Sequence, residues 1–158
     1  MSDKIIGSHE KVSPKLILER IYLKDASFES PNSPSVFETS WKPDLKVDIN
    51  TKASTLSDNR HEVVLRVTID ATTVGQKSGF IAEIQQAGIF LIEGVSDGDL
   101  RKVLAVACPT TLFPYLREAL DSLIIKGGFP AINLAPINFE MVFQEALKRS
   151  QQKQTITH

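Results

Sequence analysis

The clearest structural signal in the sequence is the segment Glu62-Val-Val-Leu-Arg-Val-Thr-Ile-Asp70. Every second residue within it is apolar and most of the residues between are polar, which is the period of a strand buried on one face. The same alternation recurs in Leu45–Ile49, and segments 16–28 and 80–92 are apolar and strand-prone. We therefore expect four strands.

Turn-forming residues separate these segments. Ser57–Asn59 and Gly75–Gly79 are short turns between the second, third and fourth strands, and short turns imply an antiparallel meander. Ser30-Pro-Asn-Ser-Pro34 is rich in turn formers, so it predicts a longer loop after the first strand.

The second half of the chain has helical periodicity. Residues 99–107 predict a short helix, and Pro109–Thr111 predicts the start of a second one, with a threonine as its cap and Pro114 in its first turn. Gly127-Gly128 predicts its end, and a last helix is expected from about Asn138. Strands followed by helices predict an α+β fold: a four-stranded antiparallel sheet with a long helix and a shorter C-terminal helix packed on one side.

The chain of 158 residues has the size of one ordinary domain and contains no internal repeat. No linker is long enough to separate two domains. We expect a flexible arm over residues 1–14, a single folded domain over 15–148 and a polar, flexible tail over 149–158.

The charge balance and the hydropathy limit the expected partners. Eighteen Lys and Arg oppose nineteen Asp and Glu, a net charge of −1, whereas nucleic-acid binders usually carry a basic stripe. Residues 1–11 are polar and lack the apolar stretch of a secretory signal, and Glu83 interrupts the most apolar region. We expect no nucleic-acid partner, no membrane insertion and a cytoplasmic location.

Few residues suggest catalytic chemistry. His9, His61 and His158 have no metal-ligand spacing, and a single cysteine excludes an internal disulfide, so we expect neither metal nor cofactor. That cysteine, Cys108, precedes Pro109 at a predicted helix start, where a helix dipole can lower a thiol pKa. The other interpretation of Cys108 is a small apolar core residue. We expect a protein that is not an enzyme, with a thiol enzyme as a distant alternative.

Three acidic residues suggest a binding surface. Asp25 and Glu29 project from one face of the first strand, about 13 Å apart. Glu83 joins them if the first and fourth strands are neighbours. The three residues form either an ordinary solvated sheet surface or a docking patch for a basic partner.

Three aromatic residues flank the loop after the first strand, namely Phe28, Phe37 and Trp41. They either cover the core or form the wall of a groove that holds extended apolar peptide.

Several blocks of sequence, in the same order along the chain, resemble the SecB family of protein-export chaperones. The longest is Arg20-Ile-Tyr-Leu-Lys-Asp-Ala-Ser-Phe-Glu-Ser-Pro-Asn32. The others are Trp41-Lys-Pro43, Leu45–Asp48, Glu62–Thr68, Glu83–Phe90, Cys108-Pro109, Leu112–Tyr115, Gly128–Pro130 and Asn133–Phe139. The resemblance spans roughly Leu16 to Leu147.

The resemblance implies a tetramer built from two dimers, without enzymatic activity. Members of this family bind non-native precursor proteins without ATP and deliver them to the motor ATPase SecA. Ala87 replaces a common family glycine, and the tail is slightly basic where acidic tails are common. These departures leave open a diverged chaperone for other clients, such as one associated with a toxin–antitoxin pair.

The resemblance also assigns roles to residues of this sequence. The SecA-docking surface comprises Asp25, Glu29, Ile81 and Glu83. The groove for client proteins comprises Phe28, Phe37, Trp41, Leu45, Val47, Phe139, Phe143 and Leu147. The contacts between protomers comprise Ala82, Ile84 and Gln86.

Overall fold

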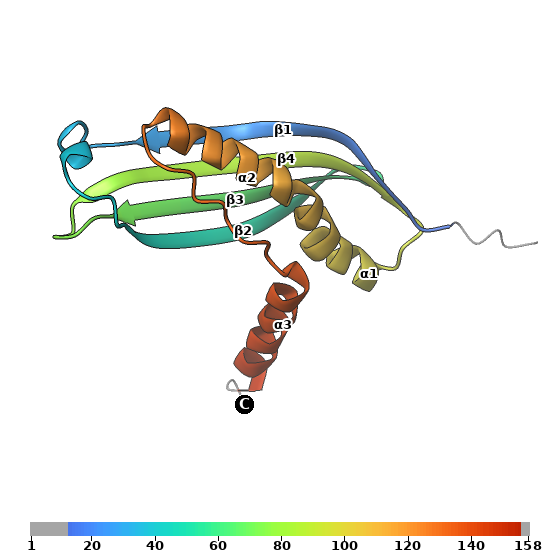
Figure 1. Cartoon of the computed structure of the whole chain (residues 1–158). Helices are drawn as coiled ribbons and strands as arrows, with labels where there is room; N and C mark the ends of the chain where they lie inside the picture. The colour runs from blue at the N-terminus through green and yellow to red at the C-terminus, as the bar shows by residue number, and fades with distance from the viewer. Residues whose placement is uncertain (1–12, 156–158) are drawn as a thin grey trace, which may run out of the picture.

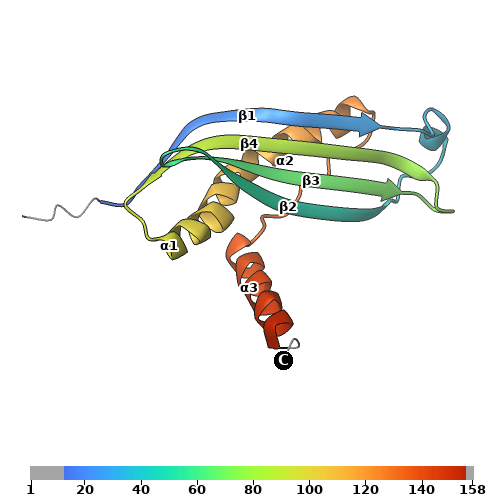
Figure 2. The same cartoon turned by 180° about the vertical axis from the view of Figure 1, so that it is seen from behind.

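The computed structural model describes residues 13–155. Four strands form one antiparallel sheet in the order β1-β4-β3-β2, as Figures 1 and 2 show. Their bounds are Lys15–Glu29 for β1, Asp44–Ser57 for β2, Arg60–Thr72 for β3 and Ser78–Glu93 for β4. The predicted meander of the last three strands is confirmed, and β1 returns to pair with β4. Strands β1 and β2 are therefore the two edges of the sheet.

The two faces of the sheet differ because helix α2 (Cys108–Lys126) lies across only one of them (Figure 1). The face under α2 is the inner face, where the apolar residues of the alternating β3 segment are buried together with Phe80 and Ile84 of β4. None of the helices within residues 13–155 covers the opposite, outer face, as the view from behind shows (Figure 2). A core on one side thus leaves a broad polar sheet surface on the other.

The helical region after β4 is continuous, which corrects the predicted break before α2. Helix α1 (Asp97–Lys102) passes directly into a π-helical turn, η2 (Val103–Ala107), and then into α2. The N–H of Cys108 bonds to the Val103 carbonyl, five residues back. The hydroxyls of Thr110 and Thr111 donate to carbonyls one turn back, at 2.6 and 2.9 Å, instead of capping a new helix.

The last helix, α3 (Phe139–Thr155), follows a connector over residues 127–138 that crosses the inner face. Helix α3 starts on the same side of the sheet as α2 and then projects beyond the β2 edge (Figure 1). The predicted α+β fold class is confirmed. Residues 149–155, which the sequence predicts to be part of a flexible tail, are helical here. Residues 1–12 of the predicted arm and 156–158 of the tail lie outside the described residues.

Within residues 13–155, no helix combines the length and the apolar character that crossing a lipid bilayer requires.

Candidate functional site

Five aromatic side chains meet at one end of the inner face. The ring of Phe129, from the connector, lies 4.6 Å from Trp41, 5.0 Å from Phe80, 5.2 Å from Phe37 and 6.3 Å from Phe28, between centroids. We call these five residues the aromatic cluster. The sequence predicts Phe28, Phe37 and Trp41 as groove residues, but it does not identify Phe80 and the central Phe129. The signal for Phe129 was its position directly after a helix-ending glycine pair.

Glycines make the close packing of this cluster possible. A Cβ on Gly127 would lie 2.1 Å from a ring carbon of Phe28, and a Cβ on Gly79 would lie 2.6 Å from Trp41. No side chain tolerates such distances without a shift of the ring. The end of α2 therefore approaches β1 closely because residue 127, directly after the helix, carries no side chain.

An apolar strip continues from the cluster along edge strand β2. Leu45 and Val47 face the inner side, yet their side chains are 41% and 43% exposed because no helix covers this edge. Ile49 follows on the same face, about 13 Å from Leu45 along the strand. We call Leu45, Val47 and Ile49 the β2 strip.

The strip ends in a groove of about 320 Å³ between β2 and the first two turns of α3. Its apolar lining comprises Ile49, Ala105, Ile137, Phe139, Val142, Phe143 and Ala146. Phe143, one of the residues expected in the client groove, is among them. Phe139 is almost completely buried and packs edge-on against Phe113, so it belongs mainly to the core. Leu147 lies one turn further along the projecting helix and does not line this groove.

Two polar side chains of α2 fix the connector that separates the aromatic cluster from the groove. One carboxylate oxygen of Asp121 accepts hydrogen bonds from the backbone N–H groups of Ile132 and Asn133, at 3.0 and 3.3 Å. Arg117 donates to the Leu134 carbonyl at 3.5 Å. These bonds satisfy backbone groups that would otherwise lack partners in a segment without regular structure.

The four residues assigned to SecA docking lie together on the outer face. Glu29 is directly opposite Ile81, and Ser27 is directly opposite Glu83, so the two strands present them side by side. Asp25 lies on the same face of β1 and is exposed, as is Glu29. Strands β1 and β4 are adjacent, and Glu83 therefore lies on the same surface as the other two carboxylates.

The acidic area is wider than the sequence predicts. Asp70 lies opposite Ile81 on β3, and Asp48 lies opposite Thr68 on β2. The alternation in β2 and β3 was the signal that could have placed both carboxylates on this face. We call Asp25, Glu29, Asp48, Asp70 and Glu83 the acidic surface.

Glu83 is the most tightly held member of the acidic surface. The guanidinium of Arg66 forms an ion pair with its carboxylate, with Nε 2.8 Å from Oε1, and Gln85 donates a further hydrogen bond. These hydrogen bonds, Arg66 first, lower the pKa of Glu83 below its ordinary value. The carboxylate is therefore ionised at neutral pH.

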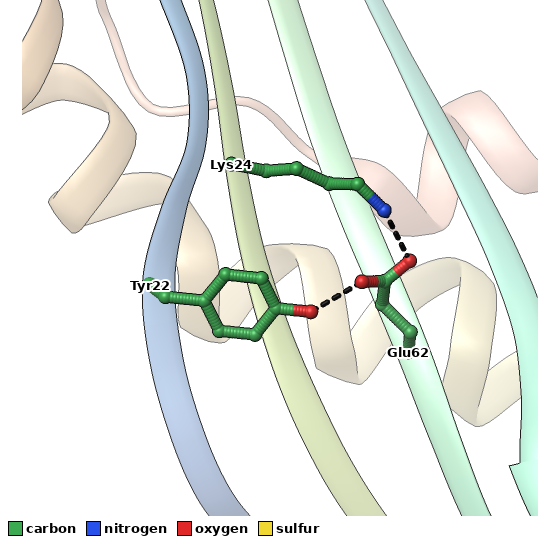
Figure 3. Close-up of polar contacts among 3 residues, drawn as sticks. All are labelled: Tyr22, Lys24 and Glu62. Atoms are coloured by element: carbon green, nitrogen blue, oxygen red, sulfur yellow. Dashed lines mark hydrogen bonds and ion pairs between the residues drawn. The ribbon is translucent and has the colours of Figure 1, made fainter.

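A polar network spans the middle of the outer face (Figure 3). Glu62 of β3 accepts a hydrogen bond from the Tyr22 hydroxyl and one from the ammonium of Lys24, 2.8 Å away, both from β1. The Lys24 bond, followed by the Tyr22 bond, lowers the pKa of Glu62. Burial, together with the neighbouring carboxylate, raises the pKa of Tyr22 to about 12. The network joins β1 to β3 across β4.

The three residues expected at contacts between protomers lie on the inner face of β4. Ala82 and Ile84 have no exposed surface, and Gln86 is 6% exposed. Gln86 donates to the Tyr22 carbonyl at 3.1 Å. Because α2 covers this face of β4, these side chains pack within the protomer, and their part in assembly stays a prediction.

The surroundings of Cys108 contradict the activated thiol considered above. The residue lies inside the continuous helical region rather than at a helix start, and its side chain is buried. Burial raises the pKa of the thiol to about 12. Among residues 13–155, no group of three or more His, Cys, Asp or Glu side chains is arranged to hold a metal ion.

Comparison with known proteins places this architecture among SecB-like folds. A SecB-like chaperone from Mycobacterium tuberculosis, solved with a peptide from the HigA1 antitoxin, superimposes with a TM-score of 0.59 over 77% of this chain and 90% of that chain. Its sequence is 15% identical, so the likeness concerns the fold.

The sequence comparisons show the family. The family model "Preprotein translocase subunit SecB" matches residues 9–150. Protein-export protein SecB from Marinobacter nauticus is 50% identical over 147 residues, which are 93% of this chain and 88% of that protein. The protein of the same name from Hahella chejuensis is 51% identical over 141 residues, or 89% and 88% of the two chains. The chain belongs to the SecB family, as the resemblance implies.

Proposed function

We propose that this protein is an ATP-independent chaperone that binds non-native secretory precursors and keeps them competent for export. The observation that carries the proposal is the apolar path on the inner face, from the exposed ring of Phe37 in the aromatic cluster through the β2 strip to the α3 groove. The names of the relatives at about 50% identity support it.

Such a path selects clients by their folding state. A folded precursor has buried its apolar segments, whereas an unfolded one exposes them as extended chain. Burying apolar surface contributes about 25 cal/mol per Å², so a segment that covers several sites gains affinity without a strict sequence code. Binding of this kind uses no nucleotide and no cofactor.

We further propose that SecA docks on the acidic surface. That surface lies on the outer face, and the client path lies on the inner face, so one protomer can hold a client and a docking partner at the same time. The exposed carboxylates favour a partner with basic side chains. Release of the client then follows from competition by SecA.

The proposed assembly is a homotetramer of two dimers in the cytoplasm. Ala82, Ile84 and Gln86 remain the residues expected at its contacts, and their side chains lie under α2. The alternative function, a chaperone linked to a toxin–antitoxin pair, has less support, because the antitoxin-bound chaperone shares only 15% identity with this chain.

Refolding of a destabilised secretory precursor without ATP tests client binding. We expect the protein to delay refolding, and unchanged refolding at saturating concentration would contradict the proposal. Val47→Asp places a charge in the β2 strip and should weaken client binding about tenfold, since burial of a valine contributes about 1.5–3 kcal/mol. The control is Leu56→Asp, on the same strand and 52% exposed but outside the strip.

A further inference from the structure

A second depression lies on the outer face, beside the acidic surface. It has a volume of about 560 Å³ and is open to solvent. Its charged and amide-bearing lining residues are Lys24, Asn50, Lys52, Glu62, Arg66 and Gln85. We call this depression the cationic pocket. It lies outside both the client path and the acidic surface.

The pocket has a surplus of positive charge. Three cations, Lys24, Lys52 and Arg66, line it together with one carboxylate, that of Glu62. Lys24 is paired with Glu62, and Arg66 is paired with Glu83 outside the pocket. Among the ion pairs of residues 13–155, none includes Lys52, whose exposed ammonium acts on Glu62 only through its electrostatic field. Lys52 is therefore available to an incoming anion.

Strand register makes the pocket continuous with the acidic surface. One cross-strand row of the outer face contains Asp25, Gln85, Arg66 and Asn50. The next row, about 7 Å further along, ends at Lys52. The pocket thus begins in the row that contains Asp25, and Arg66 belongs to both areas because it lines the pocket and pairs with Glu83.

We propose that the cationic pocket binds a carboxylate of the partner that docks on the acidic surface. The docking segment of that partner then carries basic side chains for Asp25 and Glu29 and an acidic side chain for Lys52. Lys52 lies about 7 Å along the strands and about 14 Å across the sheet from Asp25. The inference rests on the docking proposed above and specifies its chemistry. The ammonium of Lys52 and the side-chain amides of Asn50 and Gln85 are the donors that a carboxylate needs.

The surroundings favour a protein carboxylate over a nucleic-acid phosphate. Repeating phosphates that extend from the pocket would run along Asp25, Asp48 and Glu83, where like charges repel. A partner segment with basic side chains at one end and an acidic side chain at the other meets the acidic surface with the first and the cationic pocket with the second. Such an arrangement fixes the register of the partner as well as its affinity.

Charge reversal at Lys52 distinguishes this proposal by the sign of its effect. If docking depended only on the acidic surface, Lys52→Glu would strengthen binding of a basic partner, because it makes the face more negative. We expect instead that Lys52→Glu weakens binding of purified SecA at least fivefold, measured by calorimetry at physiological salt. Lys52→Gln should weaken binding less.

The matched control is Lys46→Glu. Lys46 is exposed on the same strand and the same face, opposite Asp70, but outside the pocket. The charge change is identical, and we expect unchanged or tighter binding. Because both positions are exposed, we expect both variants to fold, and thermal unfolding checks that they do.

Each outcome has one reading. Equal or tighter SecA binding by Lys52→Glu overturns the proposal, as does equal weakening by Lys46→Glu. Binding of a short RNA that Lys52→Glu abolishes would assign the pocket to phosphate and also overturn it. Failure of the underlying docking proposal is seen separately: SecA affinity would then be unchanged in Asp25→Asn combined with Glu29→Gln.

Discussion

The carboxylate of Asp121 on α2 accepts a hydrogen bond from the backbone N–H of Ile132, 3.0 Å away in the connector. The same oxygen accepts a second bond from Asn133, whose backbone has a positive φ of 52°. Because the connector leads directly into α3, this one side chain helps to set where the groove between β2 and α3 lies.

Removal of this carboxylate should loosen the connector. We expect Asp121→Ala to cost about 1–3 kcal/mol of stability, the usual effect of leaving backbone donors unpaired, and to weaken client binding several-fold. Asp121→Asn keeps an accepting oxygen and should retain most of both properties. The control Glu118→Ala changes an exposed residue of the same helix. Urea unfolding and peptide titration measure the two effects, and equal behaviour of the Asp121 and Glu118 variants would contradict the prediction.

The same glycine substitution should have opposite effects at two positions, one directly after α2 and one within α1. Gly127→Ala drives a Cβ to 2.1 Å from Phe28 and should cost about 1–3 kcal/mol. Gly98→Ala, in α1, meets no atom within 4 Å and should stabilise the protein by about 0.4–1 kcal/mol. Thermal unfolding of the two variants gives the comparison. If Gly127→Ala left the thermal stability unchanged, the ring of Phe28 would have moved aside without cost, which contradicts the prediction.

Loss of the Glu62 charge should destabilise the protein in a pH-dependent manner. Glu62→Gln removes the ion pair with Lys24 and should cost about 1–2 kcal/mol at pH 7, where this carboxylate is ionised. Because the folded-state pKa of Glu62 is lowered, its contribution is present at neutral pH and is lost as the pH falls through that value. The difference in the free energy of unfolding between Glu62→Gln and wild type should therefore shrink below about pH 4.

Urea unfolding at several pH values measures this dependence. Glu19→Gln is the matched control, since it breaks the 3.0 Å pair with Arg60 at a more exposed site. We expect that substitution to cost about 0–1 kcal/mol. A Glu62 variant as stable as the Glu19 variant at pH 7 would argue against the network.

The thiol of Cys108 should be unreactive in the folded protein. Its burial and its raised pKa of about 12 leave almost no accessible thiolate at neutral pH. We expect slow reaction with iodoacetamide in buffer and rapid reaction in urea, followed by mass spectrometry. Fast alkylation of the native protein, with loss of an activity, would instead revive the thiol-enzyme interpretation.

The sheet could be predicted because its signals are local. Alternation in β2 and β3 and the short turns between strands predict the meander. The two-residue period of a strand also places Asp25 and Glu29 on one face of β1. The continuity of α1, η2 and α2 could not be predicted this way. Pro109 and Thr110 are typical of a helix start, whereas in the structure they follow a π-helical turn inside one continuous helical region.

The remaining differences arise from contacts between distant parts of the chain. Ala82 and Ile84 are buried because α2 covers their side of the sheet. Phe129 lies in a segment without periodicity, and its ring contacts Trp41 and Phe80, which are tens of residues away. Its central position in the cluster therefore becomes visible only in three dimensions.

Trp41 is the one tryptophan of the chain, and its ring lies against Phe80 and Phe129 in the aromatic cluster. The indole is thus an intrinsic fluorophore at the start of the path proposed for clients. A tryptophan-free peptide that displaces water or rotates these rings changes the emission of the single tryptophan of each protomer. The arrival of an unfolded chain can therefore be timed optically on the unlabelled protein, within milliseconds of mixing.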